Sequence, residues 1–248
     1  MKEKIYTIPL TESLEQDSEC PFCYIEKKLE ADAVNYALGA AMMEPDYRIV
    51  SNEKGYCNKH FSMMLAAPNK LSLALVLETH FNEVIESLEA KENCLNSNVK
   101  SSLFKSKNAI SPSRCIAETT DKICSSCVIC DKVNNHMERY IDTFFYLWEK
   151  ESDFREKVKN SKGFCLEHFS KLCSKSENHL KNQNEFLREI YSLELNNLKR
   201  IYEDIHKFTL KFDYRNKDME WGSAIDAPIR ACEKLQGYCQ NYKEETKS

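Results

Sequence analysis

Glycine and proline are scarce in this sequence, with five and six residues among 248. Average usage would give roughly three times as many glycines and about twice as many prolines. Turn-rich β-sandwiches and glycine-dependent phosphate loops are therefore poor fits to the chain. It also lacks a P-loop, a dinucleotide-binding glycine motif, Gly-x-Ser-x-Gly and His-Glu-x-x-His. No common nucleotide-binding or hydrolytic signature is present.

A charge excess of one sign and long hydrophobic runs are also missing. The 35 Lys and Arg against 39 Asp and Glu give a formal charge of −4, which offers no basic footprint and disfavours nucleic acid as a partner. The longest strongly apolar stretches, Ala37–Met43 and Leu73–Leu77, are far too short to span a bilayer. The N-terminus has no apolar core or cleavage site of a secretory signal. We therefore predict a cytoplasmic protein without a membrane association.

Cysteine is the residue type present in excess, with twelve in the chain. In a reducing compartment such cysteines are metal ligands or buried apolar residues more often than disulfides. They fall into an internal repeat. Cys20-Pro-Phe-Cys23 is followed, after 33 residues, by Cys57-Asn-Lys-His60, and Cys127-Val-Ile-Cys130 is followed, after 34, by Cys165-Leu-Glu-His168. Matched motifs at nearly equal spacing indicate a tandem duplication.

Each repeat supplies three thiolates and one imidazole, which is a common closed donor set for tetrahedral zinc. The repeat logic predicts one structural Zn²⁺ site within each half. The predicted ligands are Cys20, Cys23, Cys57 and His60 in the first half and Cys127, Cys130, Cys165 and His168 in the second. Protein donors then fill every position, so the metal stabilises the fold and leaves no place for substrate. We assign no catalytic residue, and an enzyme is disfavoured.

Other interpretations of the cysteines stay open. Cys124 extends the second pair, and Cys124, Cys127 and Cys130 with a distant Cys165 also form an iron–sulfur arrangement. The first half has no counterpart of Cys124, which favours zinc. Buried free cysteines beside core histidines are a second alternative. A redox dithiol at the first pair is a third, although it lacks the βαβ context of thioredoxin.

Apolar residues at steps of three or four predict helices through both halves. One runs from Ile25 to Ala40 and is closed by Pro45, and the longest, around Leu187 to Ile205, has about 30 residues. Each Lys-Gly-aromatic tripeptide is expected to form a turn that delivers the Cys-x-x-His motif to the start of the next helix. A short helix is expected between Asp226 and Gly237.

The predicted fold is all-α, with two tandem helical repeats, each closed by a Cys₃His zinc site, and a short C-terminal helix. Serine and asparagine accumulate between the repeats and indicate a linker there. The predicted divisions are a first repeat at 1–92, a linker at 93–122, a second repeat at 123–213 and a C-terminal helix and tail at 214–248.

Several motifs together resemble a known family. They are Ile8-Pro9, Cys20-Pro-Phe-Cys23, Arg48, Asn52, Lys54-Gly-Tyr-Cys57 with His60, Gly163-Phe-Cys165-Leu-Glu-His168, and the ending from Asp226-Ala-Pro228 to Gly237. The pattern is similar to an uncharacterised bacterial family, classed as a domain of unknown function and found mainly in anaerobic Gram-positive bacteria. The resemblance covers most of the chain. It implies a bacterial cytoplasmic setting and brings no activity with it.

These features favour a zinc-stabilised cytoplasmic scaffold or adaptor that is not catalytic and binds another macromolecule. A duplicated helical unit presents an extended face, and amphipathic helices can receive partner helices. The expected partner is an unidentified protein. One alternative is a redox- or metal-responsive protein with an iron–sulfur or labile zinc-thiolate site. Another is an enzyme whose active site lies between the halves.

Overall fold

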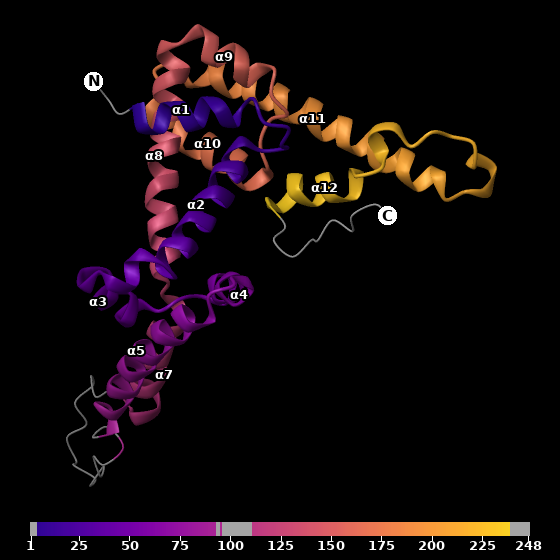
Figure 1. The fold of residues 1–248 in the computed structure, drawn as a ribbon. Helices are drawn as coiled ribbons and strands as arrows, with labels where there is room; N and C mark the ends of the chain where they lie inside the picture. Colours follow the sequence, from indigo (N-terminus) through magenta and orange to yellow (C-terminus); the bar gives the residue numbers. More distant parts are fainter. Residues whose placement is uncertain (1–3, 93–94, 96–110, 239–248) are drawn as a thin grey trace, which may run out of the picture. The chain divides into compact units, whose positions relative to one another are not determined.

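The computed structural model describes residues 4–92, 95 and 111–238 (Figure 1). These residues form helices, turns and loops, and no β-strand occurs among them. The expected all-α fold is confirmed. None of the helices in these ranges combines the length with the apolar composition that crossing a bilayer requires.

The chain forms two compact units, and these are not the two sequence repeats. Unit 1 contains Met1–Lys28 and Asn135–Ser248, and unit 2 contains Leu29–Asn134. Helices α2 (Pro21–Ala37) and α8 (Val128–Lys150) each begin in one unit and end in the other. Unit 2 is therefore one continuous segment, whereas unit 1 is assembled from the two ends of the chain. The predicted boundaries at 92 and 123 both fall inside unit 2.

Unit 1 contains the longest helix. Its elements, besides parts of α2 and α8, are α1 (Lys4–Ser13), α9 (Ser152–Lys159), α10 (Leu166–His179), α11 (Gln183–Lys211) and α12 (Ala227–Gln236). The 29 residues of α11 confirm the long helix expected there. Helix α12 follows its N-cap Asp226 and ends before Gly237, as predicted. Helices α10, α11 and α12 pack on one another (Figure 1).

An aromatic cluster forms the core of unit 1. Phe144 on α8 is fully buried, and its ring centroid lies 5.4–6.3 Å from the centroids of six others. These rings belong to Phe22, Phe145, Trp148, Phe154, Phe164 and Phe186. Burial of each such side chain stabilises a fold by about 1.5–3 kcal/mol. Because Phe22 lies between Cys20 and Cys23 and Phe164 precedes Cys165, the core fixes both cysteine loops.

Unit 2 is built around α5. Its elements, besides parts of α2 and α8, are a 3₁₀ turn at Ala40–Met43, α3 (Pro45–Lys54), α4 (Asn58–Ala66), α5 (Lys70–Glu89) and α7 (Pro112–Ser125). Helices α3, α4 and α7 all contact α5. The expected helix to Ala40 ends at Ala37 and gives way to the 3₁₀ turn. Pro45 closes that run, but it also begins α3, since its fixed φ suits the first helical position.

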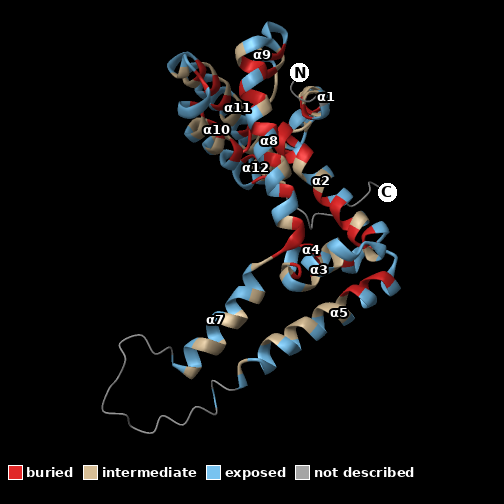
Figure 2. Cartoon of the chain, turned by 90° about the vertical axis from the view of Figure 1, so that its left-hand side faces the viewer, coloured by how far each residue is buried: buried red, intermediate tan, exposed pale blue. Residues whose placement is uncertain are grey.

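The predicted linker at 93–122 is wrong in its second part. Helix α7 begins at Pro112, and the hydroxyl of its N-cap Ser111 accepts a hydrogen bond from the backbone N–H of Arg114. The same serine and proline that suggested a linker are common at the start of a helix. Helix α7 is amphipathic, yet none of its residues is buried (Figure 2). Residues 93–94 and 96–110 of the predicted linker lie outside the described residues.

Candidate metal centres

The structure gathers the eight predicted ligands into two groups of four, but not in the predicted combinations. Cluster A contains Cys20, Cys23, Cys165 and His168, and cluster B contains Cys57, His60, Cys127 and Cys130. In each cluster one donor atom from every residue lies within 4.8 Å of the others. The predicted groupings within each sequence half are wrong. The Cys-x-x-Cys motif of each repeat is completed by the Cys-x-x-His motif of the other.

The Cys-x-x-Cys motifs lie at the N-termini of helices α2 and α8. The backbone N–H of Cys23 points to Sγ of Cys20 at 3.5 Å, and that of Cys130 points to Sγ of Cys127 at 3.4 Å. A helix N-terminus stabilises negative charge through its unpaired N–H groups and its dipole. Both motifs therefore present paired sulfurs where thiolates are favoured.

The Cys-x-x-His motifs follow glycine turns, as predicted. Gly55 and Gly163 have φ values of 63° and 76°, a backbone region that other residues rarely adopt. Cys57 and Cys165 are then the N-caps of α4 and α10. Each histidine falls in the first helical turn, with Nδ1 3.2 Å from Sγ of Cys57 in cluster B and 3.1 Å from Sγ of Cys165 in cluster A.

The donor atoms of cluster A are closely spaced and buried. Sγ of Cys23 and Sγ of Cys165 are 3.5 Å apart. Nδ1 of His168 lies 3.6 Å from Sγ of Cys20 and 3.5 Å from Sγ of Cys23. All four residues are buried.

Cluster B has nearly the same geometry. Sγ of Cys57 and Sγ of Cys130 are 3.6 Å apart, and Nδ1 of His60 lies 3.3 Å and 3.4 Å from Sγ of Cys127 and Cys130. Cys57 and Cys130 are partly exposed, whereas the other two residues are buried. Cluster B is therefore nearer to solvent than the wholly buried cluster A.

These distances fit a tetrahedral metal ion. With Zn–S of about 2.3 Å and Zn–N of about 2.0 Å, a tetrahedron requires S···S of about 3.7 Å and S···N of about 3.5 Å. A disulfide would require S–S of about 2.05 Å. The cysteines of both clusters are free thiols. Both clusters thus offer the closed Cys₃His donor set that the sequence predicted.

The protonation states of the donor thiols and histidines favour binding of a cation at both clusters. Burial opposes a charged His60, but hydrogen bonds to Cys127 and Glu30 outweigh it and raise its pKa to about 10. Burial raises the pKa of Cys127, yet the same histidine and the backbone bring it to about 6. His168 behaves like His60, since Cys165 and Cys20 overcome burial and raise its pKa to about 10. A divalent ion would replace the proton that these thiolate–imidazole pairs share.

Two glutamates on α2 face the second nitrogen of the histidines. Oε1 of Glu30 lies 3.6 Å from Nε2 of His60, and Oε2 of Glu26 lies 4.0 Å from Nε2 of His168. A carboxylate behind a metal-binding histidine fixes the ring and strengthens it as a donor. The sequence analysis missed both residues. Their signal is the pair of acids one helical turn apart on α2, the helix that carries Cys23.

Contacts between distant segments decide which motifs meet. In cluster A the ring of Phe22 stacks on His168, with centroids 5.3 Å apart, and packs against Phe164. In cluster B the Ser126 hydroxyl donates to the carbonyl of Lys54 at 2.6 Å, and the backbone N–H of Val128 donates to that of Gly55 at 3.1 Å. Each Cys-x-x-Cys loop is thus fitted to the glycine turn of the other repeat.

The structure does not bring together the four cysteines of the iron–sulfur arrangement. Cys165 belongs to cluster A, whereas Cys127 and Cys130 belong to cluster B. Cys124 is exposed and is not part of either cluster. This agrees with the absence of a counterpart of Cys124 in the first half of the sequence.

The described residues thus form a helical protein with two Cys₃His clusters, and each cluster is a candidate metal centre. The chain belongs to a family of unknown function (DUF6062), whose model matches residues 1–242. The resemblance to such a family is thereby confirmed. No curated protein and no solved structure gives a significant match.

Proposed function

We propose that the protein is a zinc-stabilised helical adaptor, which binds another protein in the cytoplasm and is not an enzyme. The observation that carries the proposal is the closure of both clusters, where four protein donors lie within 4.8 Å of one another. Such a site leaves no position for water or substrate. Structural zinc also adds its binding free energy to folding, which suits units of modest size.

The surface proposed to receive the partner is an apolar groove between α4 and α5. It encloses about 430 Å³ and is lined by Phe61, Leu65, Leu73, Leu77, His80, Phe81 and Val84. Leu65 and Phe81 are 59% and 61% exposed. Exposed apolar surface of this kind often marks an interaction site. The lining residues from Leu73 to Val84 follow helical spacing, which suits a helix laid along the groove.

The charges on α5 indicate the kind of helix that binds. Glu78, Glu86 and Glu89 are exposed beyond the groove, and Lys70 is the one cation of α5. The acidic excess of α5 favours the approach of a helix that carries lysine or arginine, because complementary charges steer association. We therefore propose a basic amphipathic helix of another protein as the occupant.

Elemental analysis of the purified chain tests the zinc component. The expected result is two zinc ions per chain in a colourless protein. A brown protein containing iron and sulfide, or a folded protein without metal, would overturn it.

A peptide titration tests the groove. The probes are an amphipathic helical peptide of leucine and lysine and its leucine–glutamate counterpart. The basic peptide should bind more tightly, and Phe81→Glu should abolish this binding. Leu71→Glu is the matched control, because Leu71 is also on α5 and 71% exposed but does not line the groove. Equal binding of both peptides, or self-association of the chain through this face, would contradict the proposal.

A further inference from the structure

A buried lysine of the C-terminal helix joins the two loops that carry the donors of cluster A. Lys234 on α12 is 1% exposed. Its Nζ donates to the carbonyl of Lys162 at 2.6 Å and to that of Glu19 at 3.3 Å. Glu19 precedes Cys20, and Lys162 lies in the glycine turn before Cys165. One ammonium group therefore holds together the two halves of the metal site.

The same lysine pairs with a buried glutamate of α11. Oε1 of Glu194, which is 2% exposed, lies 3.3 Å from Nζ of Lys234, and Oε2 accepts a hydrogen bond from the backbone N–H of Phe164 at 2.8 Å. A buried charge without its partner is strongly destabilising. Undocking α12 would leave Glu194 buried without its cation, directly beside the loop of Cys165.

Cluster B is closed without such a helix. The carbonyl of Lys54, which corresponds to Lys162 in the other repeat, accepts directly from the hydroxyl of Ser126 at 2.6 Å. Ser126 precedes Cys127 just as Glu19 precedes Cys20. In cluster A the two loops are joined by the exposed ion pair of Lys162 with Asp17 and, in addition, by the buried ammonium of Lys234, which lies 215 positions beyond Glu19.

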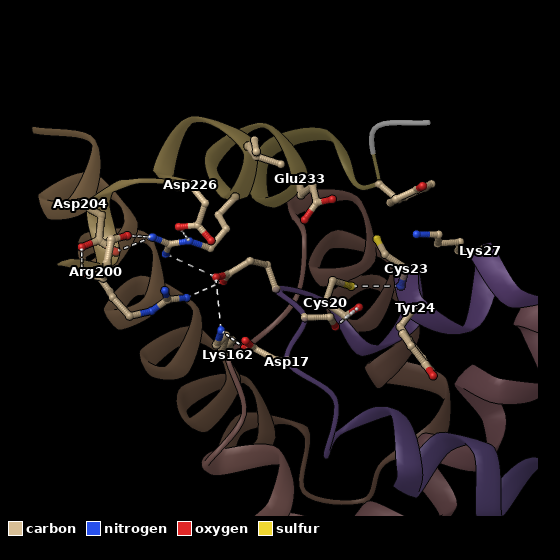
Figure 3. Close-up of a pocket in the computed structure, with 16 residues that line it drawn as sticks. Asp17, Cys20, Cys23, Tyr24, Lys27, Lys162, Arg200, Asp204, Asp226 and Glu233 are labelled. Atoms are coloured by element: carbon tan, nitrogen blue, oxygen red, sulfur yellow. Dashed lines mark hydrogen bonds and ion pairs between the residues drawn. The ribbon is translucent and has the colours of Figure 1, made fainter. Parts of the chain in front are cut away.

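The end of α12 also lies against the sulfurs. A Cβ on Gly237 would be 3.4 Å from Sγ of Cys23 and 3.8 Å from Sγ of Cys165. Beside this contact lies a cavity of about 670 Å³, with Glu233 and Asp226 on one side and Cys20 and Cys23 on another (Figure 3). Helix α12 packs on α10 and α11, and it borders this open space beside the sulfurs.

We infer that α12 is a latch for cluster A: its docking through Lys234 strengthens metal binding there, and metal binding holds α12 in place. The two effects must be equal because coupling between binding equilibria is reciprocal. This inference rests on the proposed metal-binding role. It makes cluster A the responsive centre, where loss of metal releases the C-terminal helix.

Chelator competition on the full chain tests the latch. Lys234→Met combined with Glu194→Gln removes both buried charges while keeping side-chain size, and Lys199→Met on the exposed face of α11 is the control. In the double variant one of the two zinc ions should be released about tenfold faster, within the usual range of coupling. The second ion should be released at the rate of the unaltered protein. Unchanged release of both ions would overturn the latch.

Hydrogen exchange of the unaltered protein gives a second test that needs no substitution. Removal of zinc by a chelator should raise the exchange rate in residues 227–237. The increase should be larger there than in α1, which also lies in unit 1. Equal exchange of α12 with and without zinc would refute the coupling. If the protein as purified holds no metal, the zinc proposal itself fails; if it holds two ions and α12 does not respond, only the latch fails.

Discussion

Sγ of Cys20 lies 3.6 Å from Nδ1 of His168, although the two residues are 148 positions apart. His60, the histidine of the same sequence repeat, belongs to the other cluster. Each site therefore uses one motif from each half of the sequence. This arrangement has consequences that can be measured.

Paired cysteine substitutions should reveal the exchanged ligands. Cys20→Ser should lower the metal content from two ions per chain to one. Adding Cys165→Ser should remove no further ion, because both residues serve cluster A, whereas adding Cys57→Ser should remove the second. Metal analysis of the purified variants decides the matter. Cys124→Ser is the control and should retain two ions. If adding Cys165→Ser removed the second ion and adding Cys57→Ser did not, the ligands would instead be grouped within each repeat.

Removal of metal should destabilise both units, because each cluster joins two segments that are far apart in the sequence. We expect a chelator strong enough to strip thiolate zinc to reduce helical circular dichroism and to lower the melting temperature, since metal binding contributes directly to folding. Zinc added back under reducing conditions should restore the signal. Full helicity and an unchanged melting temperature in verified metal-free protein would argue against structural metal.

The glutamates behind the histidines should act on one cluster each. Glu30→Gln should weaken metal binding at cluster B by about 10–100-fold, the usual effect of losing such a carboxylate, and leave cluster A unchanged. Glu26→Gln should affect cluster A instead. Competition with a chromophoric chelator in the Cys57→Ser and Cys20→Ser backgrounds isolates each site. An equal loss at both sites would show that the effect is a general change in stability.

Phe144→Ala should be among the most destabilising substitutions in unit 1. The ring is fully buried among six other aromatic residues, and its removal should lower the free energy of unfolding by about 3–5 kcal/mol. Tyr146, two positions further on α8, is 49% exposed. Tyr146→Ala should change the free energy of unfolding by less than about 0.5 kcal/mol. Chemical denaturation of the zinc-loaded protein measures both. Similar losses of unfolding free energy in the two variants would show that Phe144 is not at the centre of the core.

The eight donor residues could be predicted, because short sequence motifs identify them. Spacing in Cys-x-x-Cys and Cys-x-x-His places donors on one side of a turn, and Gly55 and Gly163 mark the turns that begin the next helices. The combination of motifs was not predictable, since it depends on contacts such as Phe22 with His168. Equal gaps within each repeat favoured the wrong pairing. A spacing rule contains no information about which distant loop complements another.

Other differences have similar causes. The segment that forms α7 was assigned to a linker because serine, asparagine and Pro112 accumulate between the repeats, although Ser111 and Pro112 in fact begin an amphipathic helix. Lys234 lies in a short helix of mixed polarity, where a lysine ordinarily faces solvent. Only the carbonyls of two remote loops and the carboxylate of Glu194 explain its burial.

The nested order of the ligands has a consequence during synthesis of the protein. All donors of cluster B lie between positions 57 and 130, inside the interval of 142 residues that separates Cys23 from Cys165. A ribosome adding about 5–20 residues each second needs on the order of ten seconds to cross that interval. For that time the first two thiols have emerged without their later partners, open to oxidation or to capture of a stray ion, while the inner segment can already mature.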